Sequence, residues 1–454
     1  MLSHKNKITL IGAGPAGSLL AIYLARRGFA VEIFERRPDM RIVEISAGRS
    51  INLALSTRGL YALREVGLFD HLMNLAVPMK GRMMHGRDGS LTFQRYGKDD
   101  SEVIYAVLRG ELNKALLTAA EQHENVKIHF NRRCTGMDIK TGELELWDEI
   151  AQQKKCAAAE VVIGTDGSAS ALRLEMQKTG RFNFAQEYLE HGYKELTIPA
   201  GPGGEFLIEK NALHIWPRKT YMLIALPNTD GSFAGIFFFP YEGEPSFASL
   251  NTAEKVLAFF QEQFPDALPL MPDLLETYSS NPTGSMVTIR CEPWHMGGKT
   301  LLLGDAAHAI VPFFGQGVNC AFEDCTVLNS CFDGFQGNWE ELFQRFQIRR
   351  KENTDAIADL ALENFIEMRD RVADPHFLLK KKVEQALQQK FPDLFVPKYS
   401  MVTFHRLPYA VALEKGKVQD RILEELCRDV SSIEALDWQK AEKLVTEQLK
   451  FFDD

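Results

Sequence analysis

A glycine triplet near the N-terminus constrains the fold of this chain more than any other sequence feature. Residues 8–11 (ITLI) are mostly apolar, the pattern Gly12-x-Gly14-x-x-Gly17 follows, and an uncharged stretch continues beyond it. The first glycine permits a sharp turn, the second lets the backbone approach a pyrophosphate, and the third lets the helix pack closely on the strand. We therefore expect a strand, a tight turn, and a helix that runs to about residue 27.

The same segment shares one property with signal peptides and membrane spans. Residues 8–25 carry no charge, and Lys5 and Lys7 precede them. However, the three glycines and Pro15 would break any single helix at this point. Residues 306–322, the other long uncharged stretch, are interrupted by glycines, polar residues and a proline. The sequence therefore predicts no membrane segment.

An acidic residue follows the glycine triplet at the spacing of a dinucleotide-binding site. We expect a second strand over residues 30–35, and Glu35 at its end could accept hydrogen bonds from both hydroxyls of a ribose. The helix N-terminus would face the negative phosphates. This pattern predicts an adenine dinucleotide but does not separate FAD from NAD(P). The candidate cofactor-binding residues of this segment are Gly12, Gly14, Gly17, Phe34, Glu35, Arg36 and Arg37.

Composition excludes several classes of protein. The chain has 454 residues, enough for two or three domains. With 52 Lys+Arg against 61 Asp+Glu, its net charge of −9 lacks the positive field that nucleic acid requires. Seven cysteines without a CxxC pair indicate reduced thiols rather than a disulfide framework. The 11 histidines form no pair at metal-ligand spacing, so no metal site is expected.

The pattern of predicted secondary structure changes along the chain. Strand and helix alternate at first, which favours a parallel sheet covered by helices. Residues 204–240 contain short β-rich runs (FLIE, LHIW, YMLIALP, FAGIFFF) separated by turn signals, which favours an antiparallel sheet. A helix is expected over residues 252–264, and helical periodicity prevails beyond Asn338. The predicted fold class is α/β, with a Rossmann-like nucleotide domain, an inserted antiparallel β-sheet domain and a helical C-terminal region.

Two later segments each end an apolar strand with an acidic residue. The first is VVIGTDGSAS, with Asp166, and the second is LLLGDAAHA, with Asp305. Either aspartate alone could simply cap a helix. Together with the glycine triplet, however, the two segments resemble the single-component, FAD-dependent aromatic hydroxylases. That resemblance implies that the Asp166 segment contacts FAD and takes part in NAD(P)H binding. It also implies that Asp305 binds sugar or ribityl hydroxyls of the flavin.

Further stretches resemble the members of this family that hydroxylate L-kynurenine. These stretches are residues 48–56, 191–199, 213–217, 308–319, 364–369 and 399–404. The resemblance implies that Arg82, Tyr96, Asn364 and Tyr399 bind the substrate, with Phe314 and Gln316 near its aromatic ring and carbonyl. An arginine fork and tyrosine hydroxyls suit the α-carboxylate of an amino acid. The further cofactor-binding residues implied are Ala16, Ala54, Arg109, Cys134, Gly317, Val318 and Asn319.

The family resemblance also implies the boundaries of the domains. We expect an FAD-binding domain from residues 1–75, 105–180 and 286–345. Residues 76–104 and 181–285 would form the substrate-binding β-sheet domain, and residues 346–454 the helical C-terminal region.

The implied reaction consumes NADPH and O2 on a tightly bound FAD. It proceeds through a flavin C4a-hydroperoxide and yields 3-hydroxy-L-kynurenine, a step of tryptophan catabolism and NAD biosynthesis. No side chain is expected to be catalytic in itself, because the cofactor carries the difficult chemistry. Hydroxylation of another small aromatic acid is the main alternative, and a non-catalytic FAD-fold carrier is a second.

The C-terminus departs from the eukaryotic members, which end in a membrane anchor. Residues 405–454 are charge-rich and amphipathic here. We therefore expect a soluble, cytoplasmic enzyme, either a monomer or a homodimer.

Overall fold

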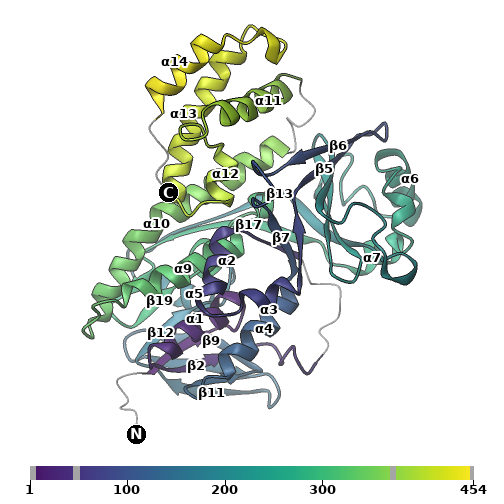
Figure 1. Ribbon diagram of the computed structural model, residues 1–454. Coiled ribbons are helices and arrows are strands. Elements are labelled where there is room, and N and C mark those ends of the chain that lie inside the picture. Colours follow the sequence, from purple (N-terminus) through teal and green to yellow (C-terminus); the bar gives the residue numbers. More distant parts are fainter. Residues whose placement is uncertain (1–6, 44–51, 369–374, 450–454) are drawn as a thin grey trace.

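The computed structural model describes residues 7–43, 52–368 and 375–449 (Figure 1). Residues 48–51 of the stretch 48–56, and Arg369 of the stretch 364–369, lie outside the described residues. All candidate site residues lie within them.

The glycine triplet follows the carboxyl end of β1, an interior strand of a six-stranded sheet. All neighbouring strands of this sheet are parallel except the β18–β19 pair. Along the sheet the strands are β18 (His295–Met296), β19 (Thr300–Leu302), β12 (Val161–Gly164), β1 (Lys7–Ile11), β2 (Ala30–Phe34) and β8 (Val126–His129). The helix α1 (Pro15–Arg26) follows the turn, so the predicted strand–turn–helix–strand unit is confirmed. The second strand ends at Phe34, and Glu35 is the first residue beyond it.

Backbone geometry explains two of the three glycines. Gly12 has φ +99°, a left-handed conformation that residues with a side chain rarely adopt. A Cβ on Gly17 would overlap the Gly12 carbonyl oxygen and lie 2.6 Å from Thr165 Oγ1. Thr165 Oγ1 in turn donates to the Ile11 and Gly12 carbonyl oxygens, at 3.0 and 2.8 Å. The Asp166 segment is therefore joined to the glycine turn by hydrogen bonds.

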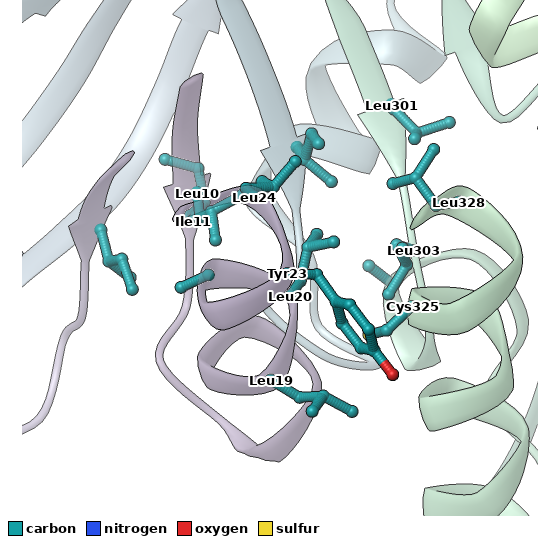
Figure 2. Packing of buried hydrophobic residues seen from close by; sticks show 14 of the residues in the cluster. Leu10, Ile11, Leu19, Leu20, Tyr23, Leu24, Leu301, Leu303, Cys325 and Leu328 are labelled. Atoms are coloured by element: carbon teal, nitrogen blue, oxygen red, sulfur yellow. The ribbon is translucent and has the colours of Figure 1, made fainter. Parts of the chain in front are cut away.

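The core beneath this turn is made by α1, the parallel strands and α9 (Gly317–Cys331). Figure 2 shows Leu20 and Leu24 of α1 in the same cluster as Leu10, Leu301 and Leu328. Each of these five side chains is buried. Burial of a leucine side chain stabilises the fold by about 1.5–3 kcal/mol, so this cluster holds the three loops at the carboxyl ends of β1, β12 and β19 together.

Two small sheets and further helices complete this half of the molecule. One sheet is β11–β10–β9 and the other is β3–β7–β4. The strands are β3 (Asn52–Leu55), β4 (Ala76–Met79), β7 (Ile104–Leu108), β9 (Arg132–Asp138), β10 (Glu143–Asp148) and β11 (Gln153–Ala158). The helices are α2 (Thr57–Glu65), α3 (Phe69–Met73), α4 (Arg109–Glu121), α5 (Ala171–Gln177) and α8 (Asp305–His308).

A seven-stranded sheet forms the second part of the molecule. Its order is β17 (Gly284–Glu292), β13 (Asn183–Ile198), β16 (Phe233–Pro240), β15 (Tyr221–Pro227), β14 (Ala212–Arg218), β5 (Gly81–His85) and β6 (Leu91–Arg95). All pairings are antiparallel except that of β14 with β5. The helices α6 (Ala253–Gln263) and α7 (Leu274–Ser280) belong to this part.

Alternation along β16 divides its phenylalanines between two cores. Phe237 and Phe239 pack with residues of α6, whereas Phe238 points to the opposite face and the cluster that contains Phe314. Residues 206–209 (FLIE) were expected to form a strand, and this prediction is wrong. The half-buried ring of Phe206 instead packs against Phe233, with 5.8 Å between the ring centres. This contact does not require the segment to pair with a neighbouring strand.

Helices dominate beyond Asn338, as predicted. They are α10 (Trp339–Ile366), α11 (Pro375–Lys390), α12 (Lys398–Thr403), α13 (Tyr409–Cys427) and α14 (Trp438–Gln448). In Figure 1, α11, α13 and α14 lie at the end of the molecule opposite β2 and β11. None of the helices in the described ranges is both long enough and apolar enough to cross a bilayer.

The contact at Gly17 predicts the effect of adding one methyl group. Gly17→Ala should lower the free energy of unfolding by about 1–3 kcal/mol, because the new Cβ meets backbone atoms that cannot move aside. Urea denaturation of the apoprotein measures this difference. Gly180→Ala is the matched control, since a Cβ at that position has no atom of the described ranges within 4 Å. Equal stability of the two variants would contradict the assigned packing.

Candidate active site

One cavity of about 320 Å³ extends from the glycine turn to α12. Twelve of the predicted site residues line it: Gly14, Ala16, Ala54, Arg82, Tyr96, Arg109, Asp305, Phe314, Gln316, Gly317, Val318 and Tyr399. They come from sequence positions far apart, and the parallel sheet and the β5–β14 pairing bring them together. The cavity volume is typical of small-molecule sites.

The end of the cavity at the glycine turn has the properties of a phosphate cradle. Gly14 is the N-cap residue of α1, and no side chain caps the helix there. A Cβ on Gly14 would have no atom of the described residues within 4 Å, in contrast to Gly12 and Gly17. Open space and uncapped N–H groups at a helix N-terminus suit an anionic phosphate. This end of the cavity therefore fits the pyrophosphate of FAD.

The side chain of Glu35 stabilises the turn itself. Its Oε2 accepts a hydrogen bond from the Ala13 N–H at 2.8 Å, and its Oε1 accepts one from the Arg37 N–H at 2.9 Å. Each carboxylate oxygen has a further lone pair, so these bonds leave acceptors for a ribose. Glu35 is not among the residues that line the cavity.

The two aspartates at the strand ends have different surroundings. Asp305 lines the cavity and is accessible from it, while its enclosure by the protein raises the pKa of its carboxyl against the opposing effects of Arg109 and His308. Asp166 lies beside the cavity, and its Oδ2 accepts from the N–H of Ala171, the first residue of α5, at 2.7 Å, whereas Ser170 is the N-cap residue of that helix. Its buried Oδ1 has no hydrogen-bond partner in the described part of the chain.

At the opposite end of the cavity, a cation lies beside two phenols. The Arg82 guanidinium carbon lies 5.0 Å from the ring centre of Tyr399 and 5.5 Å from that of Tyr96. The two tyrosine rings are stacked at 5.4 Å, and Phe314 stacks on Tyr399 at the same separation. Burial raises the pKa of both phenols, so they remain neutral hydrogen-bond donors at pH 7.

The Arg82 side chain is charged, but one of its nitrogen atoms lacks a hydrogen-bond partner among the described residues. Burial works against its charge, but Tyr399, Tyr96 and Glu367 outweigh it and raise the pKa of Arg82. Its buried Nε has no hydrogen-bond partner among the described residues. A buried donor without a partner costs about 1–3 kcal/mol, and an anion in the cavity would stabilise the charge of the Arg82 guanidinium.

Two predicted ligand residues hold the loop that lines the cavity. Asn364 Nδ2 donates to the Phe313 carbonyl oxygen at 2.6 Å. Asn319 Nδ2 donates to the Ala54 and Gly315 carbonyl oxygens, and its Oδ1 accepts from the Ser56 N–H at 2.8 Å. Neither asparagine lines the cavity, so the structure gives both a positioning role.

The other predicted residues lie away from the cavity lining. Cys134 is buried in the core of the nucleotide half, and Phe34 stacks on His129 at 5.0 Å. Arg36 and Arg37 are exposed beyond β2. Gly12 and Gly17 shape the turn. The structure therefore brings together the residues around the flavin and substrate ends, while those predicted for the adenosine end remain outside this cavity.

Sequence reasoning missed a buried ionic network behind the cavity. On α9, Glu323 accepts from Arg58 Nε at 3.0 Å and from Arg350 at 2.6 Å. The neighbouring Asp324 pairs with Arg350 Nε and with His308 Nε2, both at 2.6 Å. The signal for this network is weak, since it consists of two adjacent acids inside an otherwise uncharged helix.

Three members of this region could in principle bind a metal. Potential ligand atoms of His308, Cys320 and Asp324 lie within 4.8 Å of one another. However, the Arg350 guanidinium already contacts Asp324 and lies 3.4 Å from the Cys320 Sγ. A fixed positive charge thus occupies the position from which a metal ion would neutralise the carboxylate.

Comparisons with known proteins agree with this geometry. A family model described as FAD binding domain matches residues 5–333. A kynurenine 3-monooxygenase of Myxococcus xanthus (strain DK1622) is 54% identical over 99% of this chain and 97% of its own. One from Dictyostelium discoideum is 46% identical over 97% of this chain and 98% of its own.

Solved structures with lower identity share the fold. A tetrameric form of 2-methyl-3-hydroxypyridine-5-carboxylic acid oxygenase matches with a TM-score of 0.65 and 20% identity, over 82% of this chain and 95% of that one. P. aeruginosa PqsL in complex with 2-aminobenzoylacetate matches with a TM-score of 0.64 and 18% identity, over 80% and 97%.

The fold, the phosphate cradle, the family model and the names of the curated relatives define an FAD-dependent monooxygenase. The identity with curated relatives over nearly the full length of the chain also shows the particular family. The chain belongs to the kynurenine 3-monooxygenase family.

The open space at Gly14 predicts a variant that folds without its cofactor. Gly14→Val places a side chain in the phosphate cradle, and its Cβ has no atom of the described residues within 4 Å, so the variant should lose flavin while keeping the fold. The ratio of flavin absorbance to protein absorbance measures the first effect, and urea denaturation of the two apoproteins measures the second. A yellow, fully loaded Gly14→Val protein would contradict the cradle.

The ionic network predicts a loss of stability at alkaline pH. Burial lowers the pKa of His308, but the charges of Asp324 and Cys320 outweigh it and raise the pKa to about 10. Stability from protonated His308 is therefore complete below the unfolded pKa of about 6.5 and is lost as pH rises through 10. The slope is at most about 1.4 kcal/mol per pH unit.

His308→Gln keeps a polar side chain but cannot titrate. We expect its free energy of unfolding to fall less between pH 7 and pH 9.5 than that of the wild type, as measured by urea denaturation at each pH. Parallel pH profiles of the two proteins would show that His308 is not charged in the folded state.

Proposed function

We propose that this chain hydroxylates L-kynurenine at ring carbon 3, with FAD as its bound cofactor and NADPH and O2 as co-substrates. The observation that carries this proposal is the single cavity that joins an open phosphate cradle to the Arg82–Tyr96–Tyr399 cluster. The names of the relatives support the same substrate. The overall reaction converts L-kynurenine, NADPH, H+ and O2 into 3-hydroxy-L-kynurenine, NADP+ and water.

The substrate end of the cavity suits an amino acid with an aromatic ketone. The α-carboxylate would pair with the Arg82 guanidinium, which lines the cavity, and accept hydrogen bonds from the neutral hydroxyls of Tyr96 and Tyr399. An arginine fork and two hydroxyls hold a carboxylate in one orientation. The ring would then extend from Arg82 toward the glycine-rich loop after Phe314.

Apolar side chains form much of the remaining lining. The seven-stranded sheet contributes Leu213, Ile224, Leu226, Ile236 and Phe238 to the cavity. These side chains would exclude water from the reacting ring and confine it to one plane. Bound FAD, once reduced, supplies the activation of O2, and the chain itself supplies binding, orientation and desolvation.

The residue roles at the cofactor are part of this proposal. Asp305 would accept hydrogen bonds from flavin hydroxyls, and Arg109 would neutralise phosphate charge across the same cavity. Gly317 and Val318, at the start of α9, would contact the isoalloxazine. The adenosine would extend toward Glu35 and Cys134, outside the cavity that the side chains enclose.

Several finer expectations remain predictions. They are the division into an FAD-binding domain, a substrate-binding sheet and a helical region, the choice of NADPH over NADH, a monomer or homodimer, and a cytoplasmic location. The pathway, tryptophan catabolism leading to NAD, follows from the proposed substrate.

A coupled assay tests the proposed function. Purified FAD-loaded protein should oxidise NADPH and form equimolar 3-hydroxy-L-kynurenine when L-kynurenine is present, with little hydrogen peroxide. Benzoate and phenol substrates should give no coupled product. Coupled turnover of one of those compounds, but not of L-kynurenine, would establish a hydroxylase of a different aromatic substrate. A protein that purifies without flavin colour would indicate the non-catalytic carrier.

Arg82 gives the sharpest single-residue test. Arg82→Ala should raise the KM for L-kynurenine about 10- to 150-fold, because a charged hydrogen-bonding group is lost, while FAD content stays unchanged. Steady-state NADPH oxidation measures KM, and absorbance measures FAD. Arg87→Ala is the control, since Arg87 is exposed and pairs with Glu262 outside the cavity. An unchanged KM in Arg82→Ala would remove Arg82 from the carboxylate site.

A further inference from the structure

Tyr409 connects the helical C-terminal region to the wall of the cavity. It is the first residue of α13, its side chain is fully buried, and its hydroxyl lies 2.9 Å from Gln316 Oε1. Gln316 lines the cavity and is itself 1% exposed. Its Nε2 lies 3.3 Å from Ser56 Oγ. The carboxamide of Gln316 is therefore held between two hydroxyls from different parts of the chain.

A cation beneath the tyrosine ring favours one direction for this hydrogen bond. The Arg58 guanidinium carbon lies 3.9 Å from the centre of the Tyr409 ring. Such a cation withdraws electron density from the phenol, which makes its O–H a better donor and its oxygen a poorer acceptor. Burial, the largest effect, raises the pKa of Tyr409 despite Arg58, so the phenol keeps its proton. The hydroxyl therefore donates to the Gln316 carbonyl oxygen.

This direction determines what the amide offers to the cavity. With its oxygen toward Tyr409, Gln316 turns its NH2 group toward Ser56, which also lines the cavity. One N–H goes to Ser56 Oγ, and no further partner for Nε2 is found within the described residues. The second N–H is then free for a hydrogen-bond acceptor of a ligand.

The position of Tyr409 is fixed by Arg58. The Arg58 guanidinium donates to the carbonyl oxygens of Val402, His405 and Leu407, which form the end of α12 and the turn before α13. Its Nε pairs with Glu323 at 3.0 Å, and its side chain is fully buried. This turn, and with it Tyr409, is thus tied to α2 and α9 rather than only to the C-terminal helices.

We propose that Tyr409 is a positioning residue that orients the Gln316 amide so that the cavity presents an N–H donor to a carbonyl oxygen of the substrate. The inference rests on the proposed function, because L-kynurenine carries an aryl ketone between its ring and its amino acid group. Tyr409 does not line the cavity, so it acts through Gln316.

The test compares two ligands on the FAD-loaded protein. One is L-kynurenine, and the other is its analogue with a methylene group in place of the ketone carbonyl. Flavin absorbance changes give the Kd of each ligand. Tyr409→Phe removes one hydroxyl and should weaken L-kynurenine binding about 3- to 10-fold while changing the Kd of the analogue less than about 2-fold. A purely structural defect would weaken both ligands equally.

Two further variants complete the experiment. Tyr23→Phe is the matched control, because Tyr23 is also buried and hydrogen-bonded, to Glu65 at 2.7 Å, but lies outside the cavity. It should leave both Kd values unchanged. Gln316→Met should show the same ligand-selective loss as Tyr409→Phe, and the double variant should be no weaker than Gln316→Met alone.

The outcomes separate this inference from the proposed function. If wild-type protein binds L-kynurenine and Tyr409→Phe weakens both ligands equally, or neither, the positioning role of Tyr409 is overturned and the function stands. Additive losses in the double variant overturn the coupling between Tyr409 and Gln316. If wild-type protein binds neither ligand, the proposed function and the inference both fall.

Discussion

The buried carboxylates Glu323 and Asp324 are the charge centre on which the arrangement of this molecule depends. They lie next to each other on α9, and three cationic side chains converge on them: Arg58 from α2, Arg350 from α10 and His308 from α8. Asp324 Oδ2 also accepts from the Gly304 N–H, immediately before Asp305. Removing one partner of such a network leaves an uncompensated buried charge, which typically costs about 3–5 kcal/mol. The network therefore ties the cofactor loop to the helical C-terminal region.

Much of the nucleotide half could be predicted from the sequence because its signals are local. The glycine triplet, the apolar strands around it and the acidic residues that end them each act within about ten residues. Parallel strands then bring their carboxyl ends together, so Gly14 and Asp305 meet at one cavity although they are far apart in sequence. The substrate residues had no such signal. Arg82 and Tyr399 would pass for ordinary surface and half-buried residues, and only the family resemblance pointed to them.

The failures of sequence reasoning have physical causes. Residues 206–209 have the composition of a strand but form none, and the half-buried ring of Phe206 packs against Phe233 instead. The ligand contacts expected of Asn319 and Asn364 stay predictions, but their amides also hold the backbone of the lining loop, which the sequence did not show. Arg58 and Glu323 are 265 positions apart, so no spacing rule could pair them. Buried charges of this kind are visible only once the helices are packed.

The helix α10 has a further consequence for how this protein can vary. It runs without a break from Trp339 to Ile366 and carries Arg350 of the ionic network and Asn364 of the lining loop on the buried side. Fourteen residues of α-helix span about 21 Å and nearly four turns, so the helix fixes the distance between the ionic network and the lining loop. Inserting or deleting a single residue there would rotate one end by about 100° against the other. Natural length changes should accordingly collect in the loops around this helix and be absent from the interval 350–364.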